Sequence, residues 1–301
     1  MGSSKNFMAH TMLAYGLIAF GIVTAAPAFQ KPHSESEQIE ALSWTARRDA
    51  SVGNLDNAWT KAQEAERLAK GALAGRAPDS DPHLATALGA ALEVESTILN
   101  MRNQKADAVE LLQAALHNWG SSSIAARLQK NLNLLTLEGK PLPPLAESEW
   151  IGINRPPPLN ALQRKFVLLV FWAHWCGDCE AEAPILAALM KTFESKGLLV
   201  IAPTKRYGFT SDDENASAER EKALIERAFS RAFADIPAVS VPLDAVNFER
   251  FGASTTPTIV LADKHGIVRL FHPGYMSESD LRSSIERLLT VDERDILKSG
   301  G

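Results

Sequence analysis

An apolar run that leads directly into a cysteine pair is the feature that constrains this chain most. Six apolar residues in a row, Phe166–Phe171, are typical of a central β-strand that is buried on both faces. Cys176 and Cys179 follow, and a helical pattern over residues 178–195 comes next. Cys176 is therefore expected at the N-terminus of a helix, where unpaired amides and the helix dipole favour an anion. Because the thiolate is the nucleophile in disulfide exchange, this position predicts a reactive and exposed Cys176.

The spacing of the two cysteines assigns a role to each. Cys179 lies one turn further along the predicted helix, behind Cys176, where it can attack a mixed disulfide and release the product. A structural disulfide gains stability by closing a long loop in the unfolded chain. A bond between these cysteines closes almost no loop, and the chain has only 2 cysteines. We therefore interpret the pair as chemical rather than stabilising, with Cys176 attacking and Cys179 resolving.

Haem attachment, zinc binding and an inert disulfide are the other uses of such a pair. A c-type haem requires a histidine directly after the second cysteine, and Glu180 stands there, which excludes it. Structural zinc requires four ligands. The chain has no second cysteine pair, although His174, His265 and His272 are present. Zinc and an inert disulfide remain alternatives, and the sequence predicts neither a metal nor another cofactor.

The N-terminal segment has the three-part layout of a secretory signal peptide. Lys5 and His10 precede an apolar run over residues 12–23, and small residues flank Pro27. As a helix the run would reach only about 18 Å, well short of the ~30 Å hydrocarbon core. The sequence therefore predicts a signal peptide over residues 1–28 and secretion across the inner membrane into the periplasm. An uncleaved membrane anchor that borrows flanking residues is the alternative.

Residues 35–138 are rich in Ala, Leu, Glu and Gln, with apolar residues at helical spacing, and predict an all-α domain. A weak internal repeat runs through them: residues 53–58 and 103–108 each hold a turn followed by a small residue, Ala58 or Ala108. These hairpins resemble tetratricopeptide helix pairs, although their spacing is longer and most Trp and Tyr signature positions are missing. A closing helix is expected over residues 124–137. The domain is either a docking surface for a partner protein or a helical spacer.

Prolines within residues 139–145 break the helical pattern and mark a domain boundary. After the strand 166–171 and the helix 178–195, the pattern predicts a strand over 198–202, a helix over 218–234, strands over 239–243, 258–262 and 267–271, and a helix over 277–289. Strand–helix–strand followed by a strand hairpin and a helix is a thioredoxin-like order. The sequence therefore predicts an α/β thioredoxin-like fold over residues 139–292, preceded by the all-α, tetratricopeptide-like domain.

Residues 139–289, half of the chain, resemble the thioredoxin superfamily and, within it, the extracytoplasmic TlpA/ResA-like branch related to peroxiredoxins. The first matching stretches are residues 139–141, the cysteine segment 175–179 with the strand before it, and Pro184 in the following helix. Further along the chain, the matches are Asp244, residues 251–252, residues 256–258, and the two segments 260–263 and 266–268. Together these stretches are more specific than a cysteine pair alone. The resemblance implies thiol–disulfide exchange outside the cytoplasm, with protein thiols and disulfides as substrates.

The resemblance also implies roles for individual residues. Pro257 matches a cis-proline that faces the cysteines and exposes backbone for an extended substrate, and Thr256 would contact the thiol pair. Glu182 matches an acidic residue that handles protons near the buried cysteine; a solvated helix carboxylate is the alternative. The expected site residues are Cys176, Cys179, Glu182 and Pro257 for catalysis, and Trp175, Thr256, Gly177 and Asp178 for substrate contact.

The chain departs from the family pattern in several places. Val170 stands where many thioredoxins carry a buried Asp, so Glu182 is the only obvious proton carrier. Asp178, between the cysteines, would disfavour the thiolate, stabilise the disulfide and make the protein more reducing. A protonated His174 would act in the opposite direction. The insertion over residues 203–237 is longer than the minimal fold needs and is expected to shape a substrate groove.

The sequence thus predicts a thiol–disulfide oxidoreductase that reduces disulfides of partner proteins, as relatives do for apocytochromes. One alternative is a thiol peroxidase, but such enzymes usually place the peroxidatic cysteine in a Thr-containing motif. Another alternative is a partner-binding scaffold whose redox pair is vestigial. The intact cysteine pair and the presence of Pro257 argue against this alternative. The sequence does not identify the electron donor; a membrane thiol transporter is one candidate. With a net charge of −5, no nucleic-acid partner is expected.

Overall fold

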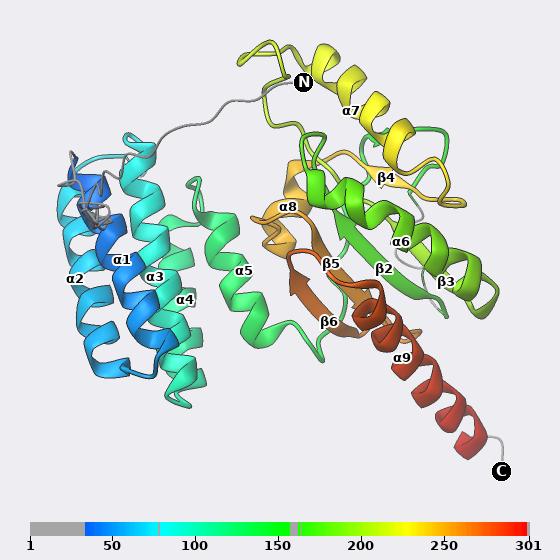
Figure 1. Ribbon diagram of the computed structural model, residues 1–301, viewed down its shortest axis with the longest axis horizontal. Helices are drawn as coiled ribbons and strands as arrows, with labels where there is room; N and C mark the ends of the chain where they lie inside the picture. Colours follow the sequence, from blue (N-terminus) through cyan, green and yellow to red (C-terminus); the bar gives the residue numbers. More distant parts are fainter. Residues whose placement is uncertain (1–33, 78, 157–161, 163, 300–301) are drawn as a thin grey trace, which may run out of the picture.

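The computed structural model describes residues 34–77, 79–156, 162 and 164–299, with side chains described as far as residue 290. The predicted signal peptide, residues 1–28, lies outside this part of the chain. Among the described residues, no helix is both long and apolar enough to cross a membrane. A bundle of helices forms one half of the molecule, and a sheet covered by helices forms the other (Figure 1).

The N-terminal half of the described chain is helical, as predicted. Its helices are α1 (Glu35–Ser51), α2 (Leu55–Leu73), α3 (Pro82–Met101), α4 (Lys105–Trp119) and α5 (Ala125–Thr136). Polar residues cap two of the starts: Ser34 and Glu37 form a capping box at α1, and the Asp81 side chain accepts from the first amides of α3. Gly120 follows the end of α4. The local signals in the sequence therefore explain where these helices begin and end.

The two helical hairpins share one turn geometry. Gly53, between α1 and α2, has φ +82°, and Asn103, between α3 and α4, has φ +61°. Each donates its N–H to the carbonyl three residues earlier, at 3.0 Å in both turns. Gly and Asn are the residues that adopt this left-handed conformation most readily. The internal repeat of the sequence is thus present in the backbone, while the likeness to tetratricopeptide pairs stays a prediction.

Small side chains let the helices of this half approach one another closely. The buried positions of α2 recur every three to four residues, and they are Ala58, Ala62, Ala65, Ala69 and Leu73. The last three of them pack in one apolar cluster with larger side chains of α3, among them Leu88 and Leu92. Ala108, which follows the second turn, is also completely buried. The residue expected to permit close packing therefore lies inside the bundle in both hairpins.

The C-terminal half is built on a four-stranded sheet in the order β3-β2-β5-β6. Its strands are β2 (Phe166–Phe171), β3 (Leu198–Ile201), β5 (Thr258–Ala262) and β6 (Val268–Pro273). β2 and β3 are parallel, joined through α6 (Gly177–Phe193) and the 3₁₀ helix η2 (Glu194–Lys196), and β5 is antiparallel to both of its neighbours. The other elements are β1 (Trp150–Ile151), α7 (Ala218–Ala232), β4 (Val241–Pro242), α8 (Ala245–Phe251) and α9 (Glu278–Ser299). This is the predicted thioredoxin-like order.

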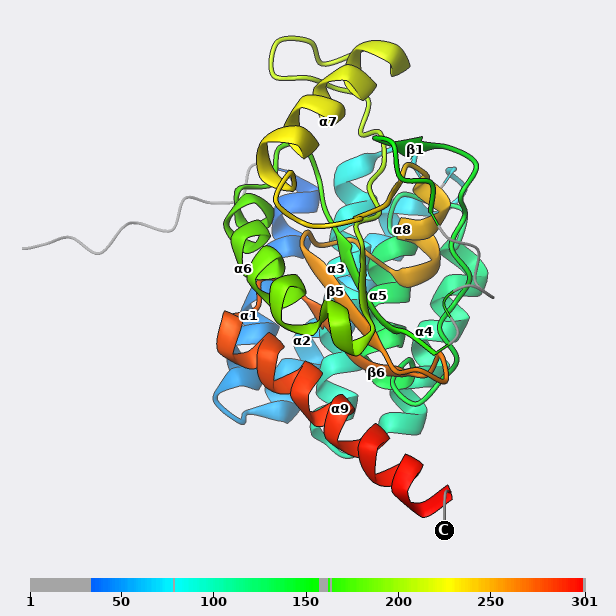
Figure 2. The same cartoon turned by 90° about the vertical axis from the view of Figure 1, so that its right-hand side faces the viewer.

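β2 lies at the centre of the sheet and is buried on both faces, as its apolar run predicted. Successive side chains of a strand point to opposite faces. One set packs with α6, α7 and α9: Phe166, Leu168 and Val170. The other set packs toward α8: Val167, Leu169 and Phe171. Figure 2 shows α6 and α9 on one side of the sheet and α8 on the other.

Most predicted elements differ from those observed by one or two residues at an end, two differ by more, and β1 and α8 were not predicted. The strand predicted over 239–243 shrinks to Val241–Pro242, because its partner β1 has only 2 residues and Pro242 has no N–H to donate. The last helix, predicted to end at residue 289, continues to Ser299. Neither difference changes the order of the elements.

Helix α5 connects the two halves, because it packs on α3 and α4 and also on α8 (Figure 1). The Asn133 side-chain amide donates to the Phe251 carbonyl at 2.8 Å in a buried hydrogen bond. At Gly252 a Cβ atom would lie 2.2 Å from the backbone nitrogen of Lys130. Leu137, just beyond α5, belongs to the apolar cluster of the C-terminal half. The halves therefore meet through backbone contact, and the domain boundary between residues 138 and 139 stays a prediction.

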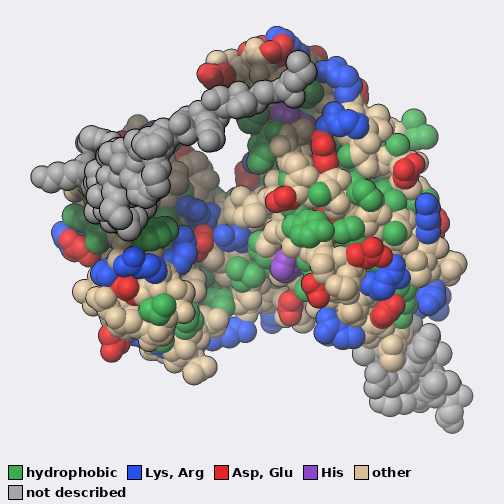
Figure 3. All heavy atoms as spheres, in the orientation of Figure 1, with side chains coloured by type: hydrophobic (Ala, Val, Ile, Leu, Met, Phe, Trp, Pro, Cys, Tyr) green, Lys and Arg blue, Asp and Glu red, His purple; other side chains and the backbone are tan. Residues whose placement is uncertain are grey.

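The face seen in Figure 3 is hollowed between the two halves. Acidic and basic side chains are interspersed over both halves on this face, so it presents no continuous basic surface.

Candidate active site

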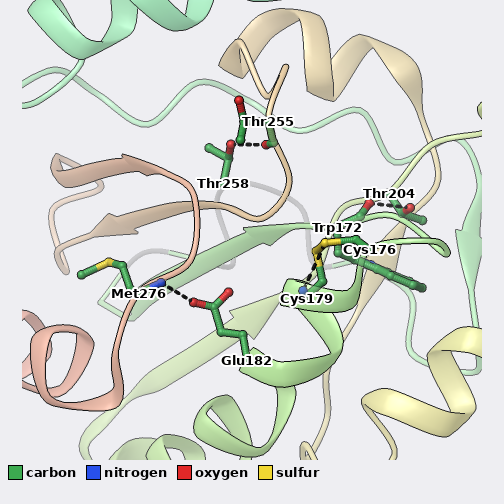
Figure 4. Close-up of a disulfide and its surroundings, with 8 residues drawn as sticks. All are labelled: Trp172, Cys176, Cys179, Glu182, Thr204, Thr255, Thr258 and Met276. Atoms are coloured by element: carbon green, nitrogen blue, oxygen red, sulfur yellow. Dashed lines mark hydrogen bonds between the residues drawn. A yellow bond between two sulfur atoms is a disulfide. The ribbon is translucent and has the colours of Figure 1, made fainter. Parts of the chain in front are cut away.

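The two cysteines lie where the loop after β2 runs into α6. Cys176 is the residue directly before the helix, and its sulfur accepts a hydrogen bond from the Cys179 N–H at 3.1 Å. The two residues form a disulfide with an S–S distance of 2.02 Å and a Cα–Cα distance of 5.3 Å (Figure 4). The first amides of a helix lack partners within the helix, so they favour negative charge on a sulfur at this position after reduction.

Exposure around the disulfide is uneven. Trp175 is 52% exposed, and Gly177 and Asp178 are exposed as well. Cys176 is only 5% exposed and Cys179 is 1% exposed. The prediction of an exposed Cys176 is therefore wrong for the disulfide form, because its sulfur is bonded to buried Cys179 and lies in the same apolar cluster.

A buried tryptophan anchors the end of β2 beneath this loop. The Trp172 indole N–H donates to the Ala202 carbonyl at 2.9 Å, and its ring lies 4.9 Å from that of Phe233. The Thr204 hydroxyl donates to the Trp172 carbonyl at 2.9 Å. These bonds join the end of β2 to the segment after β3, and sequence reasoning did not single them out. Their signal was weak, because a buried Trp and a Thr occur in many cores.

The segment before β5 contains the predicted cis-proline. The Thr256–Pro257 peptide bond is cis. Pro257 is buried and its carbonyl accepts from the Gly274 N–H at 2.8 Å, while Thr256 is half-buried. The Thr258 hydroxyl donates to the Thr255 carbonyl at 2.6 Å (Figure 4). The functional roles of Thr256 and Pro257 stay predictions.

Glu182 lies one turn beyond Cys179 on α6 and is completely buried, with 0% exposure. One oxygen, Oε1, accepts from the Met276 N–H at 3.1 Å, as Figure 4 shows. The other, Oε2, is buried without a hydrogen-bond partner among the described residues. The alternative of a solvated helix carboxylate is therefore wrong.

The surroundings of Glu182 bring its pKa close to neutral pH, while its role as a proton carrier stays a prediction. Burial raises the pKa of Glu182 to about 7, with the Met276 amide opposing and the charge of Asp178 adding to the increase. A carboxyl with this pKa can exist in either protonation state at pH 7. Val170, where many thioredoxins carry Asp, is buried among apolar side chains.

A second buried carboxylate, Glu221 on α7, faces the loop before Cys176, and sequence reasoning missed it. Glu221 is 1% exposed, and its Oε1 lies 3.3 Å from His174 Nε2. Burial lowers the pKa of His174, although Glu221 opposes this. The protonated form of His174, on which its predicted effect on the cysteines is conditional, is therefore disfavoured. In the sequence, Glu221 is one charge among many on an exposed helix, so no local pattern distinguished it.

The structure thus brings most of the predicted site residues to one end of the C-terminal half. Cys176 caps α6, Cys179 and Glu182 follow on its first turns, and Trp175, Gly177 and Asp178 surround the disulfide. Within the described part of the chain, no three His, Cys, Asp or Glu side chains form a group that could hold a metal ion.

Comparison with known proteins agrees with this geometry. The family described as thioredoxin-like domain matches residues 160–289. The thioredoxin-like protein YneN of Bacillus subtilis is 29% identical over 132 residues, which cover 42% of this chain and 68% of that protein. The thiol-disulfide oxidoreductase ResA of Geobacillus thermodenitrificans is 26% identical over 130 residues, or 43% of this chain and 67% of the relative.

Solved structures give only distant likenesses. A structure assigned to a thiol:disulfide interchange protein DsbE of Chlorobium tepidum has 25% identity and a TM-score of 0.39, over 50% of this chain and 97% of that one. A thiol-disulfide isomerase of Corynebacterium glutamicum has 17% identity and a TM-score of 0.41, over 50% and 96% of the two chains.

The sheet, the cysteine pair at the start of α6 and the family match together define the class of protein. Residues 160–289 form a thioredoxin-like domain, and relatives of this domain are thiol–disulfide oxidoreductases. Among such enzymes, this domain is similar to the YneN and ResA proteins of bacilli.

Proposed function

We propose that this protein reduces disulfide bonds of other proteins outside the cytoplasm. The observation that carries the proposal is the position of Glu182, a buried carboxyl with a pKa of about 7, one turn beyond the buried Cys179 (Figure 4). Disulfide exchange needs a deprotonated thiol at each attack. Cys176 has the helix N-terminus to favour its anion, whereas Cys179 is buried and needs a group that removes its proton.

The proposed reaction runs in two exchanges. The Cys176 thiolate attacks one sulfur of a substrate disulfide; a mixed disulfide forms, and the other substrate sulfur leaves as a thiolate that takes up a proton. The Glu182 carboxylate then accepts the Cys179 proton, and the Cys179 thiolate attacks the Cys176 sulfur. The second substrate sulfur leaves as a thiolate that takes up the proton held by Glu182, and the Cys176–Cys179 disulfide remains. Two electrons have passed to the substrate, and a dithiol donor restores the enzyme by the reverse exchange.

The direction of transfer is supported by charge near the pair. Asp178 is an exposed carboxylate between the cysteines. Its negative charge disfavours a thiolate at Cys176 and so stabilises the disulfide relative to the dithiol. The opposing contribution of a protonated His174 is weakened, because burial lowers the pKa of His174. A pair that prefers the disulfide is a reductant of other proteins.

Substrate contact is proposed for the residues that surround the disulfide. Trp175, Gly177 and Asp178 are exposed beside it. Thr256 and Pro257 lie in the cis-proline segment, which we propose pairs with the extended chain of a protein substrate. The electron donor is proposed to be a dithiol protein of the membrane, and the helical half is proposed as the site for a partner protein.

The reduction potential tests the direction. The full chain is equilibrated in glutathione or dithiothreitol buffers, with Cys176→Ser as the control that has no transition. A potential near the thioredoxin value of about −270 mV supports a reductase. A value near −120 mV, as for a strong oxidant, would reverse the proposed direction.

The roles of the cysteines are tested by trapping. Cys179→Ser is expected to accumulate a mixed disulfide with a protein substrate, because the resolving thiol is missing. Cys176→Ser is expected to accumulate none. The opposite pattern would exchange the two assignments.

Secretion is proposed from the signal-like residues 1–28. Expression of the full chain in a Gram-negative host, followed by fractionation and mass measurement, tests it. We expect periplasmic protein that starts near residue 29. A full-length protein in the membrane fraction would support the uncleaved anchor instead.

A further inference from the structure

The insertion between β3 and β4 holds the loop before Cys176 through one buried carboxylate. Glu221 Oε1 accepts from the Tyr207 N–H at 2.5 Å, and Oε2 accepts from the Gly208 N–H at 2.9 Å. Oε1 also lies 3.3 Å from His174 Nε2. Since a carboxylate only accepts, the contact with His174 requires the proton on Nε2. One side chain of α7 thus joins a loop of the insertion to the loop that carries the cysteine.

His174 and Trp175 are the two middle residues of a tight turn into α6. The Cys176 N–H donates to the Ala173 carbonyl at 3.1 Å and closes this turn. Any shift of His174 or Trp175 therefore moves the backbone that leads into Cys176. The Glu221 contact with His174 acts on the turn directly.

Aromatic rings of the insertion stand against the same turn. We call Tyr207 and Phe209 the aromatic wall. The Phe209 ring lies 5.4 Å from His174, and the Tyr207 ring lies 5.4 Å from Trp175 in an edge-on arrangement. The two wall rings are 6.3 Å apart. Trp175 keeps half of its surface exposed, so the wall and Trp175 form an apolar border beside the disulfide.

α7 packs on the sheet through buried Ile225 and Ala228, whereas the loop that carries the aromatic wall is held by Glu221. α7 lies at the end of the C-terminal half that is opposite the tip of α9 (Figures 1 and 2). Glu221 supplies acceptors for two consecutive backbone amides that precede the wall residue Phe209. Buried amides without an acceptor are costly, so removing the carboxylate releases this loop.

We infer that Glu221 is a positioning residue of thiol–disulfide exchange: it holds the aromatic wall against Trp175 and so forms a subsite for an apolar side chain next to the reacting cysteine of a polypeptide substrate. The inference rests on the proposed function and adds the substrate chemistry. The subsite is expected to bind an apolar side chain, because the aromatic rings that border it bury apolar groups and attract neither carboxylates nor phosphates. Because the aromatic wall contacts the exposed Trp175, which precedes Cys176, the bound side chain would lie beside the disulfide.

The test compares substrates that differ only at the subsite. Reduction by the full chain is measured with a disulfide-linked peptide that has Phe next to its cysteine, with the same peptide carrying Ser there, and with hydroxyethyl disulfide. We expect the wild-type protein to prefer the Phe peptide through a lower KM. Glu221→Gln places an amide N–H₂ against an N–H donor, so it is expected to raise KM for the Phe peptide about tenfold.

A structural role alone would give a different pattern. A partly unfolded variant loses rate with all three substrates in proportion to its folded fraction, whereas a lost subsite changes KM for the Phe peptide and leaves hydroxyethyl disulfide within about twofold. The matched control is Glu95→Gln, the same substitution at a buried carboxyl of α3. It is expected to leave all three KM values unchanged.

A second variant tests the same subsite if Glu221→Gln does not fold. Phe209→Ala removes a partly exposed ring and leaves the buried carboxylate in place. It is expected to reproduce the rise in KM for the Phe peptide. An equal KM for the Phe and Ser peptides in the wild-type protein would overturn the inference while the proposed function stands. Absence of exchange with all three disulfides would overturn the proposed function and the inference with it.

Discussion

Glu182 is the site residue whose pKa is most directly changed by burial. Its carboxyl is completely enclosed, and only Oε1 has a partner, the Met276 N–H. The pKa of about 7 follows from this enclosure. A carboxyl in water would be ionised at pH 7 and a poor acceptor for a thiol proton; burial makes the same group a stronger base.

Glu182→Gln removes that base. We expect resolution of the mixed disulfide by Cys179 to rise with pH through about 7 in the wild-type protein, as Glu182 ionises. In the variant the step should be about a hundredfold slower at pH 7 and should lack this rise, because general-base catalysis is lost. Stopped-flow tryptophan fluorescence over pH 5.5–8.5 measures it. Glu180→Gln, at an exposed carboxylate of the same helix, is the control; an unchanged pH profile in Glu182→Gln would contradict the role.

Glu95 offers a second prediction, on stability. It is buried in α3, and burial, with the neighbouring Glu66, raises its pKa from 4.5 to about 8. The folded state therefore binds this proton more tightly than the unfolded state. The resulting stability is fully present below pH 4.5 and is lost as the pH rises through about 8.

Glu95→Gln removes this dependence, because the amide does not ionise. We expect the variant to exceed the wild-type free energy of unfolding at pH 8.5 by about 2 kcal/mol, a value discounted for local rearrangement. Urea denaturation at pH 5 and pH 8.5 measures the difference. The same loss between the two pH values in both proteins would show that another group is responsible.

At the scale of elements, close helix packing in the N-terminal half depends on small residues after the turns. Ala58 has no exposed surface and packs between α2 and its neighbours. We expect Ala58→Leu to lower the free energy of unfolding by about 1–3 kcal/mol, because the added atoms have no space. Gln63→Leu, at an exposed position of the same helix, is the matched control. Thermal unfolding that shifts equally in both variants would contradict close packing at Ala58.

The site is assembled from elements that are far apart in the sequence. α6 supplies Cys179 and Glu182, the segment before α9 supplies the Met276 amide, and α7 supplies Glu221. The Trp172 carbonyl and indole, directly after β2, are hydrogen-bonded to the segment after β3 and so fix the start of the loop that leads into α6. The position of the cysteine loop thus depends on contacts between the segments that follow β2 and β3.

For the whole molecule, α5 and Gly252 decide how the halves meet. Gly252 has φ +64°, and a Cβ there would lie 2.2 Å from the Lys130 backbone nitrogen. We expect Gly252→Ala to cost more than the ~1 kcal/mol of a strained backbone alone, because α5 must also move. Gly53→Ala is the matched control, with φ +82° and nothing within 4 Å.

Urea unfolding of both variants, together with limited proteolysis near residues 120–140, measures the effect. Faster cleavage is expected in Gly252→Ala alone, because α5 loses its contact with α8. Equal behaviour of the two variants would show that the backbone conformation, and not the contact between the halves, determines the loss.

Local signals were sufficient for much of this protein. The continuous apolar run predicted β2 without error in its bounds, because a strand buried on both faces leaves no polar position. The turns at Gly53 and Asn103 were visible because only a few residue types adopt a left-handed backbone. The cysteine spacing and the following helix placed the redox pair at a helix start, since all these features lie within a few residues of one another.

The sequence by itself therefore determined the order of the four sheet strands, the helical N-terminal half and the place of the cysteine pair, but not β1 or α8. Only the tertiary structure decided that Cys176 is buried in the disulfide, that Glu182 is enclosed, and that Glu221 faces His174. It also decided that α5 packs on α8. The physical reason is distance along the chain. Strand and helix patterns arise from neighbouring residues, whereas burial and the state of a carboxyl depend on which distant segments fold against it.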